Sequence, residues 1–173
     1  VLHGLNEIWR CGFSATQLAD VALGLGADVP VFVGGYSAWA EGIGEVLQPV
    51  ALGERWYVLL FPGEGASTAA LFSDADLKRD AEPLIADQVS RYDDLGNAFL
   101  PVLVKRSAAV ARAVRDLGEY GQPRLTGSGS TLFLEAADKI DANRLTTALK
   151  KHYNVRAVRG TDQSVLFGKL PRR

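Results

Sequence analysis

The stretch that decides the fold is LGADVPVFVGGYSAWAEGIGEVLQPV, residues 25–50. Asp28 lies there between a glycine-rich segment and the apolar run VPVFV (29–33), which we expect to be a strand. A buried or half-buried carboxylate beside such a run is costly unless a lysine, a metal ion or backbone amides compensate it. Asp28 is therefore either a functional carboxylate or an ordinary turn cap, and only its surroundings can decide.

Helices are expected on the N-terminal side of this stretch. The apolar residues within 1–9 recur on one face at helical spacing, and no capping residue precedes them. Ser14 and Gln17 have the capping-box spacing that begins a second helix, which should end at Gly24 and Gly26. Because the chain starts inside an element, we expect that a preceding part has been lost.

Strands and helices alternate without strict repetition on the C-terminal side. This pattern indicates an α+β fold, in which helices pack on a mainly antiparallel sheet. A glycine-rich turn and a polar segment through Ser90 follow Pro62, and we place a domain boundary at residues 52–53. The expected strands are 36–40, 44–50, 55–61, 131–135, 154–159 and 164–168, and the expected helices are 99–117 and 138–152.

The composition is that of a globular protein with almost balanced charge. The 173 residues are 47% hydrophobic, and 19 basic against 20 acidic residues give a net charge of -1. That balance offers no electrostatic footprint for nucleic acid or an anionic membrane, so neither is expected as a partner. A single cysteine, Cys11, and two histidines are too few for a disulfide or a conventional structural zinc site. We expect a cytoplasmic protein and assign no metal-ligating residue.

Residues 25–50 closely resemble the segment around the catalytic aspartate of the GHMP kinases, a superfamily of small-molecule kinases. The similarity is strongest to the members that phosphorylate the 2-hydroxyl of 4-diphosphocytidyl-2-C-methyl-D-erythritol in isoprenoid precursor synthesis. It covers residues 25–33 and continues through Glu41-Gly42, Gly44-Glu45 and Pro49-Val50. The resemblance implies that Asp28 is the catalytic carboxylate, which accepts or orients the proton of the substrate hydroxyl, and that ATP and Mg²⁺ are the cofactors.

A second segment, RLTGSGSTLF (124–133), is a loop of small residues that leads into a strand. Glycines at alternate positions allow the backbone to approach a phosphate or another loop closely, although an ordinary tight turn has the same composition. The segment resembles the third sequence motif of the GHMP kinases, which packs near their nucleotide phosphate loop. By that resemblance the residues that support the phosphate loop are Thr126, Gly127, Ser128 and Gly129.

A third segment, residues 62–72, resembles the part of these kinases that holds the cytidine portion of the substrate. The resemblance implies that Phe72 offers a ring face to the cytosine and that Thr68 makes a polar contact. The alternative for Phe72 is a core aromatic. Ser73 occupies a position where relatives can carry a lysine, which is a departure from the pattern.

The resemblance also implies an architecture. Residues 1–52 would be the remnant of an ATP-binding domain of the ribosomal S5 domain 2-like type, and residues 53–173 a ferredoxin-like α/β sandwich that binds substrate. These kinases also carry an N-terminal lysine and a loop of the type P-x-G-x-G-L-G-G-G-S-S, whose amides bind the ATP phosphates. Neither part is found in these 173 residues. We therefore expect a C-terminal portion that is inactive alone, whose exposed strand edges would favour association, for example as a homodimer.

Two alternatives stay open. The chain could be a non-catalytic domain that binds a cytidine ligand or merely folds. It could also come from another GHMP kinase, such as homoserine or mevalonate kinase, although the segment around Asp28 disfavours both.

Overall fold

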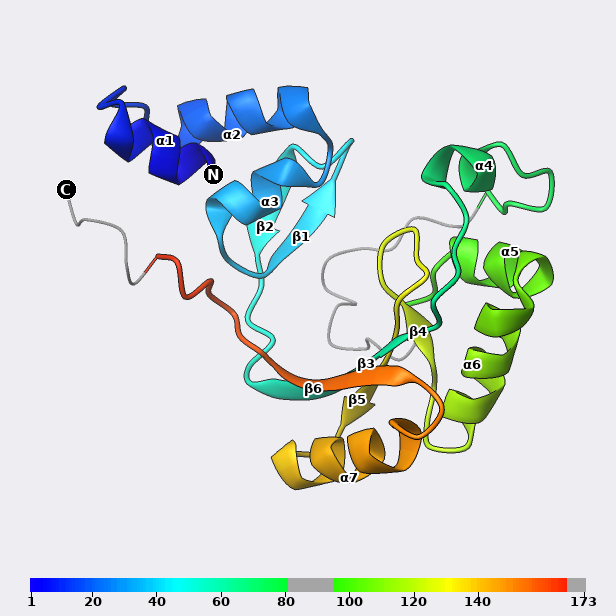
Figure 1. The fold of residues 1–173 in the computed structure, drawn as a ribbon. Coiled ribbons are helices and arrows are strands. Elements are labelled where there is room, and N and C mark those ends of the chain that lie inside the picture. The colour runs from blue at the N-terminus through cyan, green and yellow to red at the C-terminus, as the bar shows by residue number, and fades with distance from the viewer. Residues whose placement is uncertain (81–94, 168–173) are drawn as a thin grey trace. The chain divides into compact units, whose positions relative to one another are not determined.

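The computed structural model describes residues 1–80 and 95–167, which divide into two compact units (Figure 1). Unit 1 comprises Val1–Glu54 and the described part of Thr161–Arg173, and unit 2 comprises Arg55–Gly160. The chain therefore returns to unit 1 after leaving unit 2. Residues 81–90 of the expected polar segment through Ser90 lie outside the described residues. The identification of residues 1–52 and 53–173 as the two named domains stays a prediction.

Unit 2 is built on a four-stranded antiparallel sheet. Its strands follow the chain in the succession β-α-β-β-α-β, and their order across the sheet is β4-β5-β3-β6. This succession and order define a ferredoxin-like layer of helices on a sheet, which confirms the expected α+β class. The strands are β3 (Arg55–Phe61), β4 (Arg124–Leu125), β5 (Leu132–Ala136) and β6 (Asn154–Gly160).

The core of unit 2 lies between one face of this sheet and the helices. Val58 and Leu60 of β3 are paired with Leu134 and Leu132 of β5, and all four side chains are buried. They point to the same face because residues two apart in a strand do so. The helices that contribute buried residues to this core are α4 (Thr68–Phe72), α5 (Phe99–Arg106), α6 (Ala108–Gly118) and α7 (Lys139–Leu149).

The expected single helix over 99–117 is wrong, because the structure has two helices there. Ser107 separates α5 from α6 with an extended backbone, φ −127° and ψ 115°. Its hydroxyl accepts a hydrogen bond from the Val110 N–H at 3.2 Å, as an N-cap serine does. The apolar periodicity continues on both sides of this residue, so the periodicity alone hid the break.

In its described residues, unit 1 consists of three short helices and a hairpin. Its helices are α1 (Leu2–Ile8), α2 (Ala15–Leu25) and α3 (Val29–Gly34), and its hairpin pairs β1 (Ala38–Glu41) with β2 (Val46–Pro49). The predicted capping box is confirmed, since the Ser14 hydroxyl accepts from the Gln17 N–H and the Gln17 side chain from the Ser14 N–H. Within the described ranges of the chain, no helix combines the length and apolarity that crossing a membrane requires.

The expected strand over 29–33 is wrong, because VPVFV forms helix α3. A proline in the first helical turn costs no hydrogen bond, so Pro30 is compatible with a helix start. Gly35 ends the helix with a left-handed conformation, φ 68°. An apolar run of five residues has no period that separates a strand from a buried helical turn, which explains the error.

The expected strand over 164–168 is also not formed in its described part. Residues 165–167 make a turn, and Gly168 lies outside the described residues. The returning segment is attached to unit 1 by backbone contacts, including Ser37 N–H to the Asp162 carbonyl at 2.9 Å and Ser164 N–H to the Gly35 carbonyl at 2.8 Å. The Asp162 carboxylate accepts from the Leu52 and Gly53 N–H groups, both at 2.8 Å.

Tyr153, which follows α7, provides a test of unit 2. Its hydroxyl donates to the Asp116 carboxylate at 2.5 Å, and burial, followed by this hydrogen bond, raises the pKa of Tyr153 to about 12. Because the pKa is raised in the folded state, the protonated Tyr153 hydroxyl contributes its full share to the free energy of unfolding below pH 10. This contribution is lost as the pH rises toward 12. We expect Tyr153→Phe to lower the free energy of unfolding by about 1 kcal/mol at pH 7. Urea unfolding between pH 7 and 12 should show that the difference from wild type shrinks above pH 10, and a difference that stays constant would contradict this reading.

Candidate functional site

Two predicted site segments meet in unit 2. Helix α4 begins after Ser67, whose hydroxyl accepts from the Ala70 N–H at 3.2 Å. Thr68, the first residue of α4, hydrogen-bonds through its hydroxyl to the Ser128 hydroxyl at 2.8 Å. The same segments are also close at Gly65, where an added Cβ would lie 3.3 Å from the Ser130 hydroxyl. The structure thus brings the predicted substrate segment and the predicted phosphate-loop support together, although 60 residues separate them.

The loop between β4 and β5 contains the remaining predicted residues. It is a tight hairpin turn, closed by Thr126 N–H to the Thr131 carbonyl at 3.1 Å and Gly129 N–H to the Thr126 carbonyl at 3.0 Å. Gly127 and Gly129 both have positive φ, 57° and 90°, which glycine adopts readily and other residues do not. The backbone of this loop is therefore fixed by its glycines.

Asn97, which was not predicted from the sequence, lies outside the loop and hydrogen-bonds to its backbone. Its side-chain N–H₂ donates to the Leu125 carbonyl at 3.1 Å and to the Gly127 carbonyl at 2.8 Å. Its side-chain oxygen accepts from the Phe99 N–H at 2.9 Å, at the start of α5. One amide thus ties the glycine loop to the helix beside it. A lone asparagine with no motif around it carries no sequence signal for such a role.

The two glycines of the loop form a matched pair for a stability test. An added Cβ at Gly129 would lie 2.7 Å from Leu103 Cδ1 and 3.0 Å from Leu125 Cδ1, whereas Gly127 has open space. We expect Gly129→Ala to lower the free energy of unfolding by about 2–4 kcal/mol, from backbone strain and overpacking together. Gly127→Ala, with strain alone, should cost about 1 kcal/mol. Urea titration of both variants checks this, and equal losses would show that crowding is not what requires Gly129.

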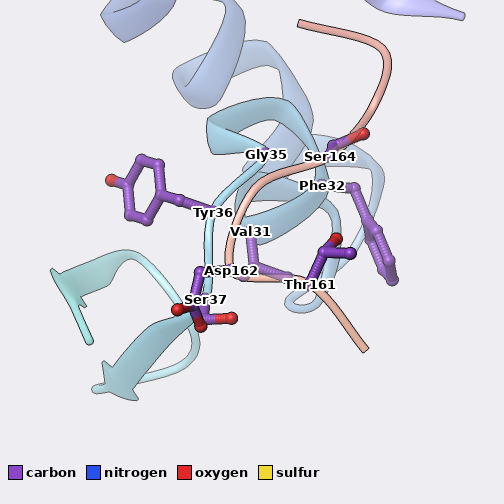
Figure 2. Close-up of a pocket in the computed structure, with 8 residues that line it drawn as sticks. All are labelled: Val31, Phe32, Gly35, Tyr36, Ser37, Thr161, Asp162 and Ser164. Carbon is purple, nitrogen blue, oxygen red and sulfur yellow. The ribbon is translucent and has the colours of Figure 1, made fainter. Parts of the chain in front are cut away.

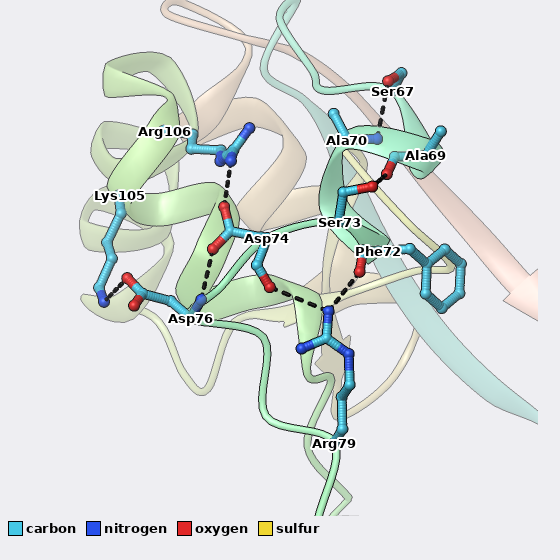
Figure 3. A network of polar contacts seen from close by, with 10 residues as sticks. All are labelled: Ser67, Ala69, Ala70, Phe72, Ser73, Asp74, Asp76, Arg79, Lys105 and Arg106. Atoms are coloured by element: carbon cyan, nitrogen blue, oxygen red, sulfur yellow. Dashed lines mark hydrogen bonds and ion pairs between the residues drawn. The ribbon is translucent and has the colours of Figure 1, made fainter.

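Phe72 lies at the last position of α4 and is not a core residue. Its side chain is 58% exposed, and its ring meets the Phe99 ring edge-on, with 5.0 Å between centroids and 89° between planes. Figure 3 shows the ring pointing away from the polar groups around it. An exposed aromatic that is braced by a second ring has a surface available to a ligand. The core alternative for Phe72 is therefore not supported.

Asp28 lies in unit 1, immediately before α3. Asp28 is exposed, and its side chain makes no capping hydrogen bond to the helix, so its carboxylate needs no compensating partner. The β1–β2 turn packs against the preceding backbone, since an added Cβ at Gly44 would lie 2.1 Å from the Ala27 carbonyl oxygen. The backbone before Asp28 is thus held while its carboxylate stays open to solvent. Such a group can accept a hydrogen bond from an incoming hydroxyl.

Unit 1 also contains a pocket of about 320 Å³ (Figure 2). Figure 2 shows Phe32 and Tyr36 pointing to opposite sides of it. Its one carboxylate, Asp162, already accepts two backbone hydrogen bonds, and Asp28 does not line it. We assign this pocket no role. Its lining residues are Val31, Phe32, Gly35, Tyr36, Ser37, Thr161, Asp162 and Ser164.

The Mg²⁺ that the resemblance implies was tested against the side chains. Across residues 1–80 and 95–167, no three or more histidine, cysteine, aspartate or glutamate side chains are grouped so that they could hold a metal ion. In phosphoryl-transfer sites Mg²⁺ is usually held by one or two carboxylates together with substrate phosphates and waters, so it does not need such a group. No step below is routed through the ion.

Comparison with known proteins identifies the class first. Residues 77–155 match the family model described as GHMP kinases C terminal. This range includes α5 to α7 and the glycine loop between β4 and β5. The expected resemblance to the GHMP kinases is therefore confirmed.

The individual relatives are 4-diphosphocytidyl-2-C-methyl-D-erythritol kinases. The protein of that name from Xanthomonas axonopodis pv. citri is 43% identical over 167 residues, which are 96% of this chain and 57% of the relative. The one from Pseudomonas fluorescens is 40% identical over 169 residues, 98% of this chain and 59% of the relative. The chain thus spans less than three fifths of the length of these relatives.

A solved structure agrees with the sequence relatives. The crystal structure of 4-(cytidine 5'-diphospho)-2C-methyl-D-erythritol kinase is similar to this chain with a TM-score of 0.72 and 25% identity. The likeness covers 90% of this chain and 60% of the other. Fold and sequence therefore lead to the same group of kinases.

Proposed function

We propose that the full-length protein containing this chain transfers the γ-phosphoryl group of ATP to the 2-hydroxyl of 4-diphosphocytidyl-2-C-methyl-D-erythritol. The observation that carries the proposal is the 43% identity, over 96% of this chain, to a kinase of that name. The hydrogen bond between Thr68 and Ser128 supports it, because it joins two segments that the proposed reaction would use together. The proposed place of this reaction is isoprenoid precursor synthesis.

In this proposal Asp28 acts on the substrate hydroxyl. The hydroxyl oxygen forms the new bond to the γ-phosphorus while the bond from that phosphorus to ADP breaks, and the proton passes to the Asp28 carboxylate. Because phosphoryl transfer usually proceeds through a loose transition state, the carboxylate mainly positions the nucleophile. The exposed, uncapped side chain of Asp28 is free to do so.

Unit 2 would hold the cytidine part of the substrate and support the phosphates. Phe72 offers an exposed ring to the cytosine, and Thr68 and Ser128 supply hydroxyls beside it. The glycine loop presents closely approachable backbone, which suits contact with a phosphate loop. The proposed support residues are Thr126, Gly127, Ser128 and Gly129.

Unit 1 is proposed to be part of a larger ATP-binding domain. Among its described residues, the buried hydrophobic cluster consists of Leu18, Ala22 and Val33. Several of its large apolar side chains are more than two-thirds exposed, which is unusual for the surface of a complete domain. These are Val1, Ile8, Trp9, Leu25, Phe32, Ile43 and Val165. A homodimer stays a prediction.

The test is a panel of acceptors with the full-length protein, ATP and Mg²⁺. The cytidine diphosphate derivative of methylerythritol, homoserine and mevalonate are each supplied at equal concentration, and ADP release is followed by a coupled assay. We expect kcat/KM to be highest for the cytidine compound by at least ~100-fold, the scale on which a site that hydrogen-bonds one substrate rejects another. Preference for homoserine or mevalonate would overturn the proposal. Binding of the cytidine compound without turnover of any acceptor would favour the non-catalytic domain.

A further inference from the structure

Helix α4 is short, and its C-terminal carbonyls need partners. The last four carbonyls of any helix have no intrahelical donor, and α4 has only five residues, Thr68–Phe72. The Ser73 hydroxyl donates to the Ala69 carbonyl at 2.9 Å. The carbonyl of Phe72 itself accepts from the guanidinium of Arg79, seven residues further along the chain.

The Arg79 guanidinium binds three backbone carbonyls at once, and Figure 3 draws two of these hydrogen bonds, those to Phe72 and Asp74. Nη2 donates to the carbonyls of Phe72 and Asp74, the latter at 3.1 Å, and Nη1 donates to the Leu77 carbonyl at 3.1 Å. The guanidinium is a rigid planar fork with five donors, so it can hold several carbonyls in fixed relative positions. A lysine ammonium on a flexible stem cannot reproduce that geometry.

Asp74 fixes the same turn from the other side. It is a nearly buried carboxylate, 9% exposed, that accepts from the Asp76 N–H at 2.8 Å and pairs with Arg106 of α5. The Asp76 hydrogen bond and the Arg106 charge lower the pKa of Asp74, so it stays ionised at neutral pH. The turn whose carbonyls accept hydrogen bonds from Arg79 is thereby attached to α5.

The Phe72 ring depends on this backbone for its orientation. It is 58% exposed, and Phe99 is its ring partner among the described residues, so the described side chains do not enclose it. The hydrogen bond from Arg79 to the Phe72 carbonyl connects this residue to the turn. A change in that contact would move the Cα to Cβ direction of Phe72 while the buried core, including Leu71, stays in place.

We propose that Arg79 is a positioning residue for cytidine recognition: its guanidinium holds the end of α4 so that the Phe72 ring is already oriented to receive the base. The proposal rests on the proposed function, because it takes Phe72 to be the stacking residue. It assigns to Arg79 no contact with the substrate. Preorganising a binding side chain lowers the ordering cost of binding and so increases affinity.

The test is a double-mutant cycle in the full-length protein with the cytidine diphosphate derivative of methylerythritol and ATP. We expect Arg79→Gln to raise KM for the cytidine substrate by about 3- to 10-fold, with kcat and KM for ATP within about twofold. In a Phe72→Ala background the same substitution should cause no further rise. Arg79→Lys should behave like Arg79→Gln, because it keeps the charge and removes the fork. Lys78→Gln, which removes the same charge one residue away, is the control and should leave every constant unchanged.

The outcomes separate this inference from the function on which it rests. An unchanged KM in Arg79→Gln, or a rise that persists undiminished without Phe72, would overturn the positioning role while leaving the kinase proposal intact. A Phe72→Ala variant that folds and keeps its cytidine affinity would instead remove the stacking role and the inference with it. A melting curve of each variant accompanies the kinetics. If Arg79→Gln is too unstable to assay, Arg79→Lys carries the same prediction.

Discussion

Asp28→Asn in the full-length protein is expected to lower turnover by at least ~100-fold while substrate affinity stays within a few-fold, because a positioned acid–base group is lost. Asparagine keeps the size of the side chain but cannot accept the proton of the hydroxyl. Asp28 is exposed and makes no capping hydrogen bond, so the substitution should leave folding unchanged. Steady-state kinetics with the cytidine substrate and ATP measure both constants.

A matched control for this prediction lies in the same unit. Asp20 is an exposed carboxylate on α2, and Asp20→Asn removes the same charge from unit 1. We expect its turnover to equal that of wild type. Turnover of Asp28→Asn within tenfold of wild type would show that Asp28 does not act on the hydroxyl.

Phe72→Ala is expected to weaken binding of the cytidine-bearing substrate by about 10- to 100-fold, since a lost stacking face costs roughly 1–3 kcal/mol. ATP affinity should change little. Because the ring is 58% exposed, thermal stability should fall far less than the several kcal/mol that truncating a buried phenylalanine costs. Calorimetric titration of each ligand, with a melting curve, checks all three expectations.

Tyr120→Ala serves as the control for the aromatic truncation. Tyr120 is 41% exposed and follows α6, outside the segments assigned to the substrate. Its removal should leave both affinities unchanged. An unchanged cytidine affinity in a well-folded Phe72→Ala protein would take Phe72 out of the site.

The elements with strong local signals could be predicted from the sequence. The Ser14 and Gln17 capping box fixed the start of α2, and the apolar run 55–61 gave β3, whose buried residues alternate as a half-covered strand requires. The prediction of a strand over 29–33 was wrong because five apolar residues have no period that distinguishes a strand from a helix. The segment is a helix that ends at Gly35. The prediction of one helix over 99–117 was wrong because apolar periodicity continues on both sides of Ser107, although Ser107 is the N-cap of α6.

The candidate site was predictable only in part. Asp28, Phe72 and the glycine loop could be named because their neighbours form recognisable segments. The contact between Thr68 and Ser128 spans 60 residues, and only the folded sheet brings it about. Asn97 and Arg79 act on backbone carbonyls, which every residue has, so no pattern of side chains marks them.

The measurement that tests the central claim most directly is ³¹P NMR of the full-length protein incubated with ATP, Mg²⁺ and 4-diphosphocytidyl-2-C-methyl-D-erythritol. The account predicts one new phosphate monoester resonance, coupled to the 2-position of the methylerythritol and formed in equal amount with ADP, while the diphosphate resonances of the substrate persist. ADP formed without that resonance, or a phosphate placed on another hydroxyl, would contradict it.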